Sequence, residues 1–138
     1  MWLVACAAAC SSPTEPAVPE GYEGEWAGTT DHGTAVSFTV AGNQVMSFTL
    51  AFNFSPACAG TETIPGPAPI VMQDPPGRPP YDQPGFAISK TNPGPTIEWG
   101  VAAAGPFAPD RRSASGQFQM VHYPGCGTAN LRWRVDRR

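Results

Sequence analysis

The chain has 138 residues, a net charge of −3 and only 14% charged residues, a size that suits one domain with one hydrophobic core. Its 17 prolines and 15 glycines interrupt the sequence too often for long helices. All eight basic residues lie after position 77, where apolar residues interrupt the arginines of 111–112 and 132–138. This spacing excludes the continuous basic surface that nucleic-acid binding requires.

The first ten residues are uncharged and end in a cysteine, Cys10, whereas residues 11–20 are polar and rich in proline. An apolar segment that closes on small residues and a cysteine is typical of a bacterial export signal with a lipidated cysteine. We therefore expect a truncated signal region at 1–10, a flexible tether at 11–20 and a single β-domain at 21–138. The lipid is expected on Cys10, where the apolar run stops, or on Cys6. The expected location is the cell envelope, with soluble secretion as the alternative.

Alternation of apolar and polar residues predicts antiparallel strands along the β-domain. In segment 45–54 the even positions are apolar and the odd positions are mostly small or polar. Segments 34–40, 96–103, 113–123 and 128–135 alternate in the same way, and 96–103 places Ile97 on the inward face. The side chains expected to form the core are Trp26, Phe38, Phe48, Leu50, Phe52, Trp99, Phe118, Leu131 and Trp133.

The turn at residues 42–43 must bring two apolar rows to the same core. A regular two-residue hairpin loop would pair Phe38 with Ser47 and send the rows to opposite faces. We therefore predict either a loop of three residues or a β-bulge, so that Phe38 pairs with Met46 or with Phe48.

Residues 65–84 contain eight prolines, and a central strand cannot pass through most of them. We expect a short edge strand at 70–72 within a long surface loop that spans 65–84. Long loops of this kind are often functional. Arg78, Tyr81 and Asp82 are the residues in it that we expect to contact a partner.

These elements predict an all-β protein, a single antiparallel β-sandwich of about 7–8 strands, with a small eight-stranded barrel as the alternative. If Cys6 and Cys10 belong to the signal region, Cys58 and Cys126 remain as an even pair in an oxidising compartment, which predicts a disulfide. A metal site built from these cysteines and the two histidines lacks any known ligand spacing, so no metal is expected.

The two histidines limit the catalytic alternatives. His32 follows Asp31 in a turn, and His122 lies at the end of a predicted strand. The sequence contains no nucleophile elbow, zinc-binding helix or phosphate-binding glycine loop, so neither catalysis nor a cofactor is expected. The enzymatic alternative is an envelope hydrolase in which a histidine meets a distant carboxylate such as Asp31 or Glu98.

The stretches at 24–30 (GEWAGTT), 36–40 (VSFTV) and 42–45 (GNQV) follow one another closely, and a cysteine comes after the third predicted strand. With 113–118 (SASGQF) and 126–128 (CGT), this pattern resembles small exported bacterial β-domains, lipoproteins among them, of unassigned function. The opening Gly24 and Trp26 are also similar to those of lipocalin-like and avidin-like barrels. That second resemblance implies a small apolar ligand or biotin inside a barrel.

The function expected from the sequence is that of an exported, lipid-anchored, non-catalytic binding or interaction module. Its expected partners are the membrane, through the N-terminal lipid, and an envelope protein or ligand. The alternatives are a carrier of a small apolar ligand and the hydrolase described above.

Overall fold

The computed structural model describes residues 20–73, 83–93 and 96–138. Within these ranges the chain forms nine β-strands, and no helix there has the length and apolarity needed to cross a membrane. The strands are β1 (Gly24–Thr30), β2 (Ala35–Ala41), β3 (Gln44–Ser55), β4 (Cys58–Pro69), β5 (Val71–Gln73), β6 (Gln83–Asn92), β7 (Trp99–Pro106), β8 (Ser113–Tyr123) and β9 (Gly127–Arg137).

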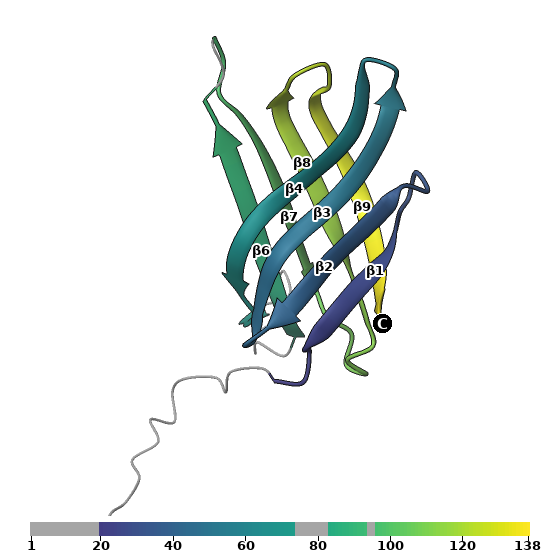
Figure 1. Ribbon diagram of the computed structural model, residues 1–138, viewed down its shortest axis with the longest axis vertical. Helices are drawn as coiled ribbons and strands as arrows, with labels where there is room; N and C mark the ends of the chain where they lie inside the picture. The colour runs from purple at the N-terminus through teal and green to yellow at the C-terminus, as the bar shows by residue number, and fades with distance from the viewer. Residues whose placement is uncertain (1–19, 74–82, 94–95) are drawn as a thin grey trace, which may run out of the picture.

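The nine strands form one antiparallel sheet in the order β4-β3-β2-β1-β9-β8-β7-β6-β5. The sheet curls until its two halves face each other across one core, as the layers of a sandwich do (Figure 1). β4 and β6 face each other without a shared ladder, so the sheet is not closed into a barrel. The predicted all-β antiparallel fold is confirmed, and the short edge strand β5 accounts for part of the larger strand number.

The interior between the two halves is filled by aromatic side chains. The Phe38 ring lies 5.8 Å from that of Trp26, 5.1 Å from that of Phe86 and 6.0 Å from that of Trp133, measured between centroids. These rings are buried, as the alternation of each strand predicts. Every residue predicted for the core is buried except Trp99, which begins β7 and is half-buried at the rim of the core.

Ile97 is 58% exposed, so the inward position predicted for it is wrong. The reason is that β7 begins only at Trp99, and alternation decides the facing of a side chain only within a paired strand.

The β2–β3 hairpin combines a two-residue turn with a β-bulge. Gly42 and Asn43 both have φ of 59°, the left-handed conformation that a tight hairpin turn requires. Phe38 pairs with Phe48, but Val40 pairs with Val45, so Met46 is the extra residue of the bulge. Both apolar rows then reach the core and Met46 is left 42% exposed, which confirms the bulge alternative.

The proline-rich segment is more regular than the sequence predicts. Residues 65–69 complete β4, residues 71–73 form the edge strand β5, and residues 83–84 begin β6, so a loop over the whole of 65–84 is wrong. β4 lies at the edge of the ladder, where prolines without an N–H group are tolerated. Two predicted sites lie outside the described residues. They are the interaction loop with Arg78, Tyr81 and Asp82, and the lipidation site at Cys10 or Cys6.

Candidate functional site

The candidate site is a group of polar side chains that meet where β4 faces β6. Glu62 of β4, Lys90 of β6 and Tyr123 of β8 come together here, and we call them the seam cluster. Glu62 is two positions from the inward-facing Ile64, and Lys90 is two positions from the inward-facing Ile88. Strand alternation therefore directs a carboxylate and an ammonium group towards the core.

Both carboxylate oxygens of Glu62 are occupied. The Tyr123 hydroxyl donates a hydrogen bond to Oε2 at 2.5 Å, and the Lys90 ammonium forms an ion pair with Oε1. Lys90 Nζ also donates to the backbone carbonyl of Thr63, at 3.0 Å. Glu62 is only 8% exposed, and these contacts supply the partners that a buried charge requires.

Aromatic rings lie beside the seam cluster. The Tyr123 ring lies 4.7 Å from that of Trp99 and 5.5 Å from that of Phe52, and Lys90 Nζ lies 5.8 Å from the Trp99 ring centroid. Burial, followed by the hydrogen bond and the negative charge of Glu62, raises the pKa of Tyr123 to about 12. The phenol therefore stays protonated at neutral pH and acts as a hydrogen-bond donor, not as a base.

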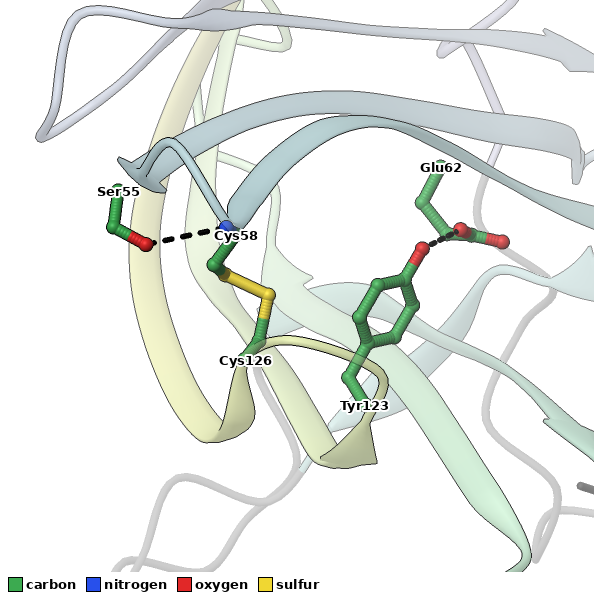
Figure 2. The surroundings of a disulfide bond; sticks show 5 residues. All are labelled: Ser55, Cys58, Glu62, Tyr123 and Cys126. Carbon is green, nitrogen blue, oxygen red and sulfur yellow. Dashed lines mark hydrogen bonds between the residues drawn. A yellow bond between two sulfur atoms is a disulfide. The ribbon is translucent and has the colours of Figure 1, made fainter.

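A disulfide lies beside the seam cluster, as Figure 2 shows. Cys58 and Cys126 have their Cα atoms 5.0 Å apart and join the start of β4 to the turn between β8 and β9. The N–H of Cys58 donates to the Ser55 hydroxyl at 3.2 Å. The predicted disulfide pair is confirmed, and it is compatible with an exported protein.

The seam cluster is chemically suited to holding β4 against β6. Its carboxylate, ammonium and hydroxyl groups are engaged with one another and with the Thr63 carbonyl. These side-chain contacts link two strands that share no ladder. The cluster therefore connects β4 to β6 through side chains, whereas backbone hydrogen bonds connect the paired strands of the sheet.

The two histidines occupy separate environments. The His32 ring packs edge-on against Phe54 at 5.1 Å, in the turn between β1 and β2. His122 is exposed near the end of β8, with φ of 53°. Asp31 Oδ1 accepts a hydrogen bond from the backbone N–H of Arg132, at 3.2 Å. Among the residues that the structure describes, the buried carboxylate is that of Glu62, which was not predicted as a site residue.

A signal for Glu62 and Lys90 was present in the sequence. Each is a charged residue at an inward-facing position of an alternating strand, where an apolar residue is expected. Alternation alone could not show that the two charges meet, because β4 and β6 are joined by side chains and not by a ladder.

No protein-family model, curated protein or solved structure matches this chain.

Proposed function

We propose that this chain is an exported β-domain that recognises a partner or ligand at the cell envelope without catalysing a reaction. The observation that carries the proposal is the filled interior. Trp26, Phe38, Phe48, Phe86 and Trp133 occupy the space in which a barrel-shaped carrier would hold its ligand. Recognition is therefore assigned to the outer surface of the domain.

Two further observations support the proposal of an exported, non-catalytic domain. The Cys58–Cys126 disulfide suits an oxidising compartment, which agrees with the export signal predicted at 1–10. The polar groups of the seam cluster are engaged with one another, which disfavours a hydrolase built around Glu62. We propose that a lipid on Cys10, or on Cys6, holds the domain to the membrane.

The anchor is tested by cell fractionation and mass spectrometry of the mature N-terminus. We expect a membrane-associated protein that begins at a lipid-modified Cys10 or Cys6. A soluble intracellular chain that still begins at Met1 would rule out both the anchor and export.

Partner binding is tested by capture from an envelope extract with two forms of the protein. The first is the intact chain, and in the second a short Gly/Ser linker replaces residues 74–82. Gln73 and Gln83 pair directly across β5 and β6, so about four linker residues can connect them without disturbing either strand. We expect the intact chain to retain a specific protein that the second form loses. Equal recovery would remove Arg78, Tyr81 and Asp82 from the proposal, and recovery of no specific partner by either form would contradict the interaction function itself.

A further inference from the structure

The outer face of the sheet has an apolar hollow over β7. The hollow has a volume of about 290 Å³ and lies between β6 and β8. The side chains around it include those of Thr91, Glu98, Ala102, Gln119 and Val121. Val121 is 38% exposed and contributes an aliphatic side chain to the surface of the hollow.

The hollow exists because Gly100 has no side chain. Gly100 pairs with Thr91 on one side and with Val121 on the other, in a ladder without a bulge at this point. A glycine inside a regular strand weakens it and often marks a place where a ligand or another backbone approaches closely.

Three strand glycines, Gly28, Gly105 and Gly116, have an explanation within the fold, whereas Gly60 of β4 has room for a Cβ atom beside the Phe52 ring. A Cβ atom on Gly28, Gly105 or Gly116 would lie 1.9 to 2.2 Å from a backbone oxygen of a neighbouring strand. A Cβ atom on Gly100 would meet nothing closer than the Thr91 methyl group at 3.3 Å and the Lys90 carbonyl at 3.4 Å. Alanine at position 100 would need the Thr91 methyl group to shift by only a few tenths of an ångström, and the missing side chain leaves the hollow open.

The rim of the hollow carries an uncompensated negative charge. Glu98 is exposed, and in the described ranges no cationic side chain lies within ion-pairing distance of it. Lys90 also lines the hollow, but its ammonium is paired with the Glu62 carboxylate. A carboxylate beside an apolar hollow is complementary to a ligand that joins a positive charge to an apolar body.

We infer that the hollow over Gly100 binds small organic ammonium compounds. The apolar body of the ligand lies over Gly100 and Ala102 against Val121, and its ammonium group lies beside Glu98. This inference goes beyond the proposed function, because it uses none of the residues 74–82 and does not depend on export or on a lipid.

The inference is tested by NMR titration of the full chain with three probes of similar size: benzylammonium, benzyl alcohol and benzoate. We expect benzylammonium to cause saturable shifts of the backbone amide signals of Gly100, Ala102 and Val121. Benzyl alcohol cannot form the charge pair with Glu98, and loss of an exposed pair should make its binding about two- to fivefold weaker than that of benzylammonium. Benzoate, which Glu98 repels, should bind more weakly still. Equal binding of benzoate and benzylammonium would overturn the inference, as would shifts confined to another part of the sheet.

Three variants separate the contributions of charge and space. Glu98→Gln should remove the preference for benzylammonium over benzyl alcohol, and Gly100→Ala should weaken both by filling the hollow. Ala51→Val, a similar enlargement on the outer face of β3, is the matched control and should bind as the unmodified chain does. If Gly100→Ala does not fold, Ala102→Leu fills the same hollow. Unchanged binding by the folded hollow-filling variant, or by Glu98→Gln, would refute the site.

Discussion

Replacing Lys90 with methionine tests how the seam between β4 and β6 is held together. Methionine keeps most of the length and the apolar stem of lysine but removes the charge, so the Glu62 carboxylate stays buried without its cation. Tyr123 still donates to one oxygen of that carboxylate. The variant should therefore be folded but clearly less stable than the unmodified chain.

The expected magnitude follows from the exposure of the two side chains. Removing one partner of a fully buried ion pair destabilises a protein by about 3–5 kcal/mol, whereas an exposed pair contributes about 0–1 kcal/mol. The Glu62 side chain is 10% exposed and that of Lys90 is 26% exposed, which places this pair between the two limits. We expect Lys90→Met to lower the free energy of unfolding by about 2 kcal/mol, equivalent to a fall in Tm of about 8 °C for a domain of this size.

The assay is urea unfolding at pH 7 with the disulfide intact, followed by tryptophan fluorescence. The double variant Lys90→Met/Glu62→Gln leaves no charge unpaired and should regain about 1 kcal/mol relative to Lys90→Met. Arg132→Met, which removes an exposed cation from the outer face of β9, is the matched control and should stay within about 0.5 kcal/mol of the unmodified chain. If Lys90→Met were as stable as Arg132→Met, or the double variant were less stable than Lys90→Met, the seam would not depend on this ion pair.

Further predictions concern the core, the disulfide and the titration of the seam cluster. Trp133→Ala should lower the free energy of unfolding by about 3–5 kcal/mol in calorimetry, and melting like the unmodified chain would contradict the burial of this ring. Non-reducing peptide mapping should recover Cys58 linked to Cys126, and replacing both with serine should lower the free energy of unfolding by up to about 4 kcal/mol. The pKa of Tyr123 is raised from 10.0 to about 12 in the folded chain, so its contribution to stability is complete below pH 10 and is lost as the pH rises towards 12. Thermal unfolding between pH 9 and 12 should therefore show a smaller fall in Tm for Tyr123→Phe than for the unmodified chain, and parallel curves would contradict the raised pKa.

The core could be predicted from the sequence because strand alternation places side chains with a period of two residues. Phe48, Leu50 and Phe52 follow this period and are all buried. The sequence could predict that the β2–β3 hairpin needs one extra residue, in its loop or in a bulge, because otherwise the two apolar rows would lie on opposite faces. The position of that residue could not be predicted, because it depends on how β3 pairs with both of its neighbours.

The candidate site was less predictable because it depends on contacts between strands that share no ladder. Glu62 and Lys90 are 28 positions apart in the chain and meet only because the whole sheet curls. The start of β7 was placed too early for a related reason. Period-two alternation continues through Ile97, whereas the ladder with β6 and β8 begins only at residues 99 and 100.

The pairing of β1 with β9 determines when this sheet can be completed. The other ladders join strands that are neighbours in the chain, but Trp26 pairs with Arg137 and Thr30 with Trp133. Closing so long a stretch of chain has the largest entropic cost of any pairing here, so we expect it to form late in folding. A chain that stopped before Gly127 would leave β1 and β8 as two long bare edges, ready to pair with other molecules. The eleven residues of β9 therefore protect β1 and β8, in the middle of the sheet, against edge-to-edge aggregation.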